Sequence, residues 1–176
     1  SRKSTVACSA RCTSAPISLV TRRMRGLAWA AIIAYDPPVA VHQETIEVRT
    51  TARGLSDVTR AVQAVVDGSK IGVGLCTVFV QHTSASLVIQ ENADRNVLVD
   101  LAEWMGELAP ESRRWRHAEE GPDDMPAHAR AAVTKTSETI PVTAGRLALG
   151  TWQALYLWEH RARTHQRRLV VHVAGE

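Results

Sequence analysis

The chain has 176 residues, of which 45% are hydrophobic and 22% charged, and its formal net charge is +3. This length suits one domain with a proper core. No apolar run approaches the roughly 18 residues that a transmembrane helix needs, so we expect no membrane association. Of 21 basic and 18 acidic residues, six basic and one acidic fall in residues 1–38, which leaves 15 and 17 in the remainder. That balance argues against binding to a nucleic-acid backbone.

Residues 1–38 differ in composition from the rest of the chain. They are rich in Arg, Ser, Thr and Ala and have no acid before Asp36, which is typical of an organellar transit peptide. The alternative is a translation start placed too far upstream, with Met24 as the true beginning. We expect this extension to lack fixed structure. The three cysteines imply no disulfide framework, which suits the cytoplasm; a transit peptide would instead indicate a mitochondrion or plastid.

The domain is predicted to span residues 39–176 and to begin with a strand and a helix. Residues 41–50 alternate apolar and polar side chains, which predicts a half-buried strand. Ser56 is a suitable cap for a helix that Gly68 would end. Two β-rich runs follow within residues 72–91, interrupted by a turn at 82–86.

The second half is predicted to hold two helices, a loop and three strands. Asn92 or Asp94 can cap a helix that ends by Pro110. Residues 111–125 have no helical or strand period and predict an ordered loop, and Pro126 is typical of the first turn of the next helix. Strands follow at 137–143, 146–160 and 167–175. The pattern predicts an α+β domain with helices on one face of a mixed or largely antiparallel sheet.

One group of polar residues follows the strand that ends at Val80. His82, Ser84 and Ser86 enter the turn there, where small hydroxyl side chains leave backbone N–H groups accessible to anions. Glu91 and Asn92 stand one short strand further on. The alternative for His82 is a hydrogen-bonded structural residue.

The segment HAEEGPDDMPAH combines imidazoles and carboxylates in twelve residues. A histidine in the first turn of a helix is favoured in its neutral form, which is the form that binds metals. Carboxylates nearby could orient such ligands. The alternative is a solvated acidic loop in which Asp124 caps the helix. The residues concerned are His117, Glu119, Glu120, Asp123, Asp124 and His128.

A third group, Glu159, His160 and Arg161, ends the aromatic strand GTWQALYLWEH. Its side chains could contact a phosphate or form an ion-paired corner. The sequence has no Gly-x-Gly-x-x-Gly, P-loop, His-Glu-x-x-His or Gly-x-Ser-x-Gly motif, so dinucleotide binding, ordinary NTPase chemistry, zincin proteolysis and α/β-hydrolase catalysis lose support.

Four ordered motifs carry a resemblance: QHTSASLVIQENAD, WRHAEEGPDDMPAHARAAV, TIPVTAGRLALGTWQALYLWEHR and RRLVVHVAGE. From about Glu44 to Glu176 the chain resembles the YjbQ family, also labelled secondary thiamine-phosphate synthase. The resemblance implies an α+β fold, a homotrimer and a polar pocket in which histidines hold a divalent metal ion, either Zn²⁺ or Mg²⁺/Mn²⁺. Carried over to this chain, the metal ligands are His82, His117 and His128, with Glu91, Asp123 and Asp124 as neighbours.

The reaction implied by the resemblance joins a pyrimidine methyl diphosphate to a thiazole phosphate and releases pyrophosphate. The leaving diphosphate needs charge neutralisation. We therefore expect Glu91, Glu120, Asp124 and Arg161 as catalytic residues, and Ser84, Ser86, Asn92 and His160 as phosphate-binding residues. Two alternatives stay open: a metal-assisted phosphate-ester hydrolase with Glu120 or Asp124 as general base, and a non-catalytic trimer that binds a metal or small ligand.

Overall fold

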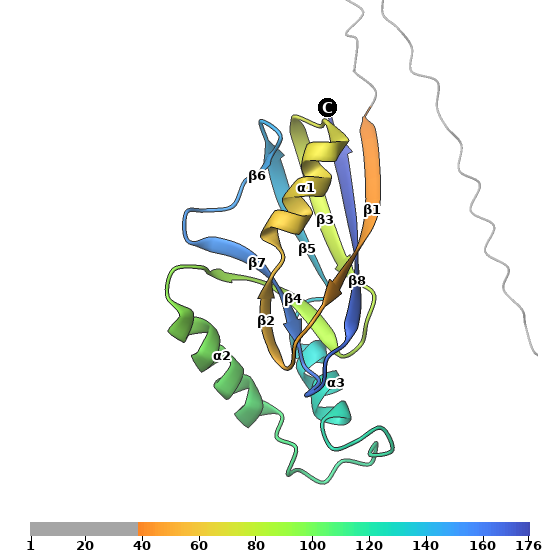
Figure 1. Ribbon diagram of the computed structural model, residues 1–176, viewed down its shortest axis with the longest axis vertical. Helices are drawn as coiled ribbons and strands as arrows, with labels where there is room; N and C mark the ends of the chain where they lie inside the picture. Colours follow the sequence, from red (N-terminus) through yellow and green to blue (C-terminus); the bar gives the residue numbers. More distant parts are fainter. Residues whose placement is uncertain (1–38) are drawn as a thin grey trace, which may run out of the picture. The chain divides into compact units, whose positions relative to one another are not determined.

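The structure is a computed structural model that describes residues 39–176 (Figure 1). The predictions for residues 1–38 lie outside the described residues. The described strands form two sheets in which every pair of neighbouring strands is antiparallel. The first sheet has the order β1 (Ala40–Arg49), β8 (Gln166–Gly175), β3 (Val73–Val80), β5 (Ser137–Thr143) and β6 (Arg146–Leu147). The second has the order β2 (Gly54–Asp57), β7 (Gln153–Glu159) and β4 (Ala85–Glu91).

Three helices complete the described part of the chain, and the predicted α+β class is confirmed. Helix α1 (Thr59–Ser69) contacts β1, β6 and β8 of the five-stranded sheet and also β7. Helix α2 (Arg95–Leu108) contacts β2 and β4 of the smaller sheet, and α3 (Asp124–Val133) also contacts β4. The helices are therefore divided between two sheets, where the sequence predicted one covered face (Figure 1). None of the helices described is long and apolar enough to cross a membrane.

The core lies between α1 and the inner faces of the two sheets. The inward-facing side chains of β3 and β8 alternate with exposed or half-buried ones, as period-two patterning requires. Strand β7 is the central strand of its sheet, and it is buried along both faces from Ala154 to Glu159. Cys76 is fully buried in this core, and burial raises the pKa of its thiol to about 11. This cysteine is therefore a packing residue rather than a reactive thiol.

One predicted element differs from the structure near Gly150. The run 146–160 was predicted as one strand, yet β6 and β7 belong to different sheets. A turn separates them: Gln153 N donates to Gly150 O at 2.9 Å, and Gly150 N donates to the Gln153 side chain at 2.8 Å. Ala144 and Gly145 form the turn of the hairpin between β5 and β6, and both residues have positive φ.

The helix caps were predicted only in part. Asp94 caps α2 as predicted, because its Oδ1 accepts from Asn96 N at 2.9 Å. Ser56 does not cap α1, since it lies in β2; Asp57 Oδ1 accepts from Thr59 N at 2.8 Å instead. The helix continues past Gly68 to Ser69, and Lys70 caps it with a left-handed φ of 61°.

Candidate metal centre

The start of α3 and the loop before it bring two predicted histidines together. Asp124 is the first residue of α3 and is buried, and His128 follows one helical turn later on the same side. The preceding loop returns His117 to this point. His117 Nε2 lies 2.7 Å from Asp124 Oδ2, and His128 Nε2 lies 3.4 Å from the same oxygen. The three ligand atoms all lie within 4.8 Å of one another.

The tautomer of His128 makes this cluster suited to a cation. His128 Nδ1 lies 3.2 Å from the carbonyl oxygen of Thr83. Because a carbonyl only accepts, Nδ1 carries the proton, and the Nε2 of the neutral ring then presents a lone pair to Asp124 Oδ2. Nε2 of His128 is therefore the nitrogen that a metal ion could use. The donor set of two imidazoles and one carboxylate fits a divalent metal.

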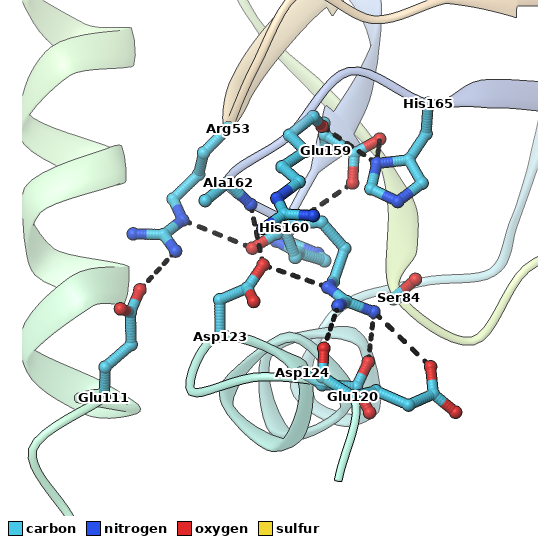
Figure 2. A network of polar contacts seen from close by, with 12 residues as sticks. Arg53, Ser84, Glu111, Glu120, Asp123, Asp124, Glu159, His160, Ala162 and His165 are labelled. Carbon is cyan, nitrogen blue, oxygen red and sulfur yellow. Dashed lines mark hydrogen bonds and ion pairs between the residues drawn. The ribbon is translucent and has the colours of Figure 1, made fainter. Parts of the chain in front are cut away.

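Arg161 holds the acidic side of the cluster. Its Nη1 donates to Asp124 Oδ1, its Nε donates to Asp123 Oδ2 at 2.9 Å, and its Nη2 donates to Glu120 O at 3.0 Å. Figure 2 shows Glu120, Asp123 and Asp124, the three residues that accept these bonds. The pairing leaves Oδ2 of Asp124 for the two histidines. Arg161 is therefore occupied by acids and a carbonyl, which differs from the predicted role of contacting a phosphate.

Asp123 anchors the loop to the end of β7 and does not cap α3 through its side chain. Its Oδ2 also accepts from Ala162 N at 2.8 Å. Burial alone would raise the pKa of Asp123, but the Ala162 N–H and the Arg161 guanidinium together hold it below its usual value. Burial alone would lower the pKa of Arg161, but Asp123, followed by Asp124 and Glu120, holds it above its usual value. The loop is thus fixed by a permanently charged pair.

The third predicted ligand, His82, lies apart from the cluster. Its Nε2 accepts from Arg168 N at 3.0 Å, so this nitrogen is bound to the backbone of β8. Burial, followed by the charges of Arg167 and Arg168, lowers the pKa of His82. The segment after β3 still serves the cluster through its backbone, because Thr83 O is the partner of His128. The structural alternative for His82 therefore agrees with the geometry.

Ser86 and His160 form a buried pair, not a surface for phosphate. Ser86 Oγ lies 2.8 Å from His160 Nε2, and both residues have 0% exposure. Burial, with the nearby charge of Arg130, lowers the pKa of His160 to about 4. The imidazole is therefore neutral at neutral pH. A solute cannot contact either side chain in this arrangement.

Ser84 belongs to a second buried network. Its Oγ accepts from Arg167 Nη2 at 3.1 Å, and Arg167 also donates to both oxygens of Glu159, at 2.6 and 2.7 Å. Thr50 Oγ1 donates to Glu159 Oε2 at 3.0 Å. Burial would raise the pKa of Glu159, but these donors hold it below its usual value. The ion-paired corner predicted as the alternative at the end of β7 is thus present.

The remaining predicted site residues lie away from the three ligand atoms or at their edge. Glu91 ends β4, and six residues at about 3.3 Å each separate it from Ala85, so it lies roughly 20 Å from the turn at Thr83. Asn92 Nδ2 donates to Gln153 O at that distant end. Glu120 is nearer: its side chain is 68% exposed, and its Oε2 lies 3.8 Å from Arg161 Nη1.

Sequence reasoning missed two buried arginines that support this region. Arg167 occupies the inward-facing period of β8 together with Leu169 and Val171, so the alternation of that strand could have indicated it. Arg130 lies on the buried stripe of α3 and donates to Ala109 O at 2.8 Å and to His160 O at 3.4 Å. In both cases the signal is a charged residue at a position where the apolar pattern of the element predicts a buried side chain.

Comparison with known proteins gives the chain its relatives. The family model described as "UPF0047 protein YjbQ-like" matches residues 44–176. The chain belongs to the YjbQ-like UPF0047 family. A UPF0047 protein of Synechocystis sp. is 59% identical over 136 residues, which cover 77% of this chain and 92% of that protein. YjbQ of Escherichia coli O157:H7 is 35% identical over 136 residues, which cover 77% of this chain and 99% of YjbQ.

Solved structures of YjbQ-like proteins have the same fold. A YbjQ-like protein from Sulfolobus solfataricus P2 is 32% identical, with a TM-score of 0.72 over 78% of this chain and 99% of that one. A member of the YjbQ/UPF0047 family from Clostridium acetobutylicum is 30% identical, with a TM-score of 0.69 over 74% of this chain and 98% of that one. The family resemblance stated from the four motifs is confirmed.

Proposed function

We propose that this YjbQ-like protein is a metal-dependent enzyme that acts on a small phosphorylated molecule. The observation that carries the proposal is the convergence of His117 Nε2, Asp124 Oδ2 and His128 Nε2 within 4.8 Å. These three residues would hold a divalent cation. Two of them come from the histidines predicted as ligands, and Asp124 takes the place of His82.

The residues around the cluster are suited to hold such ligands in place. Thr83 O fixes the tautomer of His128, and Arg161 fixes one oxygen of Asp124. Partners of this kind orient metal ligands and keep them available. A bound divalent cation would supply positive charge for a departing phosphate or diphosphate group. Asp123 is paired with Arg161. Its negative charge would therefore not cancel the positive charge of the bound cation.

Two hollows next to the cluster could accommodate a substrate. One, of about 550 Å³, is lined by residues 79–84 and Thr136, and it includes Thr83. The other, of about 250 Å³, lies in the loop before α3 and includes His117. The larger volume falls within the range of small-molecule sites, roughly 300–1,000 Å³. A substrate could place its larger, uncharged part in the first hollow and its phosphate end in the second.

Thiamine-phosphate synthesis is the specific reaction that we propose first, on the strength of the family resemblance. The test is a steady-state assay with pyrimidine methyl diphosphate, thiazole phosphate and Zn²⁺, Mg²⁺ or Mn²⁺, with pyrophosphate and thiamine phosphate both measured. We expect turnover that is lost in a variant with His117, Asp124 and His128 all replaced by Ala. Equal turnover by this variant, or none by the natural chain with any metal, would exclude the reaction. A matched variant, His42→Gln on β1, should retain activity, because this histidine lines neither hollow and is not among the three ligand residues.

Phosphate-ester hydrolysis is a second candidate, because Glu120 has a free carboxylate beside the cluster. Its side chain is 68% exposed and has only a 3.8 Å contact with Arg161, whereas Asp124 is committed to Arg161 and the histidines. Glu120 could accept a proton from an attacking water. Release of inorganic phosphate from a panel of phosphate esters, abolished by Glu120→Gln with metal binding retained, would favour this reaction. Stoichiometric metal binding without any turnover would favour a binding module instead.

We also propose that copies of the chain associate as a homotrimer through the outer face of the five-stranded sheet. Val41 and Leu75 are 63% and 53% exposed there, and the register places Val41, Ala174, Leu75 and Pro141 in one row across four adjacent strands. Phe79 is 44% exposed on the same strand as Leu75. Such apolar area supports an interface. Light scattering on the natural chain and on Leu75→Lys should give three-chain and one-chain masses, respectively; a monomeric natural chain would exclude the trimer.

A further inference from the structure

The loop between α2 and α3 carries a concentrated positive charge next to the candidate metal centre. Arg113, Arg114 and Arg116 surround Trp115, and all three arginines are exposed. A hollow of about 250 Å³ is lined by Arg113, Arg114, Trp115 and His117, together with Glu111, Ala118, Gly121 and Pro122. His117 is common to this hollow and to the cluster with Asp124. A ligand in the hollow would therefore lie beside the candidate metal.

Four other arginines near this end of the molecule are already occupied. Arg161 and Arg167 are paired with buried acids, and Arg130 donates to two carbonyl oxygens. Arg53 is paired with Glu111, the acid that lines the hollow, and so offsets its negative charge (Figure 2). The side chains of Arg113 and Arg114, by contrast, make no ion pair or hydrogen bond with any residue that the structure describes. They are the two arginines that both line the hollow and lack such a partner among the described residues, so their charge is available to an external anion.

Trp115 makes one of these two arginines a prepared anion receptor. Its Nε1 donates to Pro110 O at 3.1 Å, which fixes the indole against the end of α2. The Arg113 guanidinium carbon lies 4.7 Å from the centre of the indole ring. Stacking occupies the flat face of a guanidinium and leaves its in-plane N–H donors free for two oxygens of one phosphate. Lysine could not combine the two contacts.

The size of the hollow limits what it can hold. A volume of about 250 Å³ is below the roughly 300–1,000 Å³ of sites that enclose a whole small molecule, so only one end of a ligand fits. We infer that Arg113, Arg114 and Trp115 form a subsite for the phosphate or diphosphate end of an anionic ligand, beside His117. This deepens the proposed function and rests on it for the ligand's second contact, at the metal.

The test uses inorganic pyrophosphate as the probe and the full chain as the protein. Calorimetric titrations are run in EDTA and again with Mn²⁺, on the natural chain and on the double variant Arg113→Gln, Arg114→Gln. We expect the double variant to bind pyrophosphate at least tenfold more weakly under both conditions. Arg113→Lys should lose part of this affinity, because it retains the charge but not the stacked fork. Arg146→Gln, a neutralised exposed arginine of β6, should bind within twofold of the natural chain.

The outcomes separate the subsite from the proposed function. Mn²⁺ affinity should be unchanged in the double variant, since neither arginine is among the three ligand residues. Equal pyrophosphate affinity in the natural chain and the double variant, or no binding by the natural chain under either condition, would overturn the subsite. If pyrophosphate binds through these arginines but no metal binds, the subsite stands and the metal-dependent function fails. The replaced side chains are exposed, and unchanged thermal unfolding would verify that the variants fold.

Discussion

Two polar clusters meet at the end of β7 and differ in how they are surrounded. Glu159 and Arg167 are buried together, and each charge is satisfied by partners inside the protein. Asp124 is equally buried, but its partners His117 and His128 have side chains 45% and 34% exposed. The first cluster can only hold the fold together. The second combines a fixed acid with accessible imidazoles, which is what a metal or ligand site requires.

The division runs through three consecutive residues. Glu159 and His160 point into the buried network, whereas Arg161 holds Asp123 and Asp124 (Figure 2). Glu159 and His160 therefore contribute to stability, and Arg161 contributes to the candidate site. Substitutions in the two clusters should thus separate an effect on unfolding from an effect on binding.

The largest expected effect is on stability, from Arg167→Met. Removing this partner leaves the Glu159 carboxylate buried without its main counter-charge, which costs about 3–5 kcal/mol of unfolding free energy. Denaturant titration would measure it. Arg168→Met, the exposed neighbour on the same strand, should change stability by less than about 0.5 kcal/mol. Similar losses in both variants would contradict the assignment of the Glu159 cluster to stability.

The next effect is a pH dependence that comes from His160. Its pKa is about 4 in the folded protein against the ordinary 6.5, so the unfolded chain binds the proton first as pH falls. Stability should therefore decrease between about pH 6.5 and pH 4, by up to about 3 kcal/mol. Glu159 adds a loss in the same direction at lower pH, since its folded pKa is also lowered. His160→Gln should flatten the plot of unfolding free energy against pH between about pH 6.5 and pH 4. An unchanged plot would show that His160 is not the cause of this pH dependence.

Metal affinity should respond to the exposed cluster. His128→Ala removes one of three ligand atoms and should weaken Zn²⁺ or Mn²⁺ binding by ~100-fold, or about 2.7 kcal/mol, while the metal-free protein stays folded. Competition with a chromogenic chelator would measure the affinity. His82→Gln is the matched control, because its Nε2 is bound to Arg168 N. Loss of metal binding in this control would restore His82 to the ligand set.

The smallest expected effect is that of Arg161→Lys. Lysine retains the charge but cannot contact Asp123, Asp124 and Glu120 O together, so Asp124 should be less well oriented. We expect metal affinity to fall by ~10-fold, the lower end for residues that orient ligands. Arg163→Lys, two residues further on and exposed, should have no effect. No loss for Arg161→Lys would mean that the clamp does not orient the metal ligand.

Much of the fold follows from local patterns along the chain. The alternation in 41–50 and 167–175, the cap at Asp94 and the turn at Ala144 and Gly145 each depend on neighbours close in sequence. The split of 146–160 between two sheets could not be predicted in this way. Both halves are apolar enough for a strand, and only the sheet to which each pairs distinguishes them.

The candidate site shows the same limit more sharply. The sequence by itself determined that imidazoles and carboxylates crowd the segment from His117 to His128, and that β7 ends in charged residues. Only the tertiary structure decided that Asp124 replaces His82 beside the other two histidines and that Arg161 serves the acids. The reason is physical: a side chain's partner depends on where its rotamer points and on which donors lie nearby. Here those donors, Arg161 Nη1 and Arg168 N, lie 37 and 86 residues away from their acceptors in the sequence.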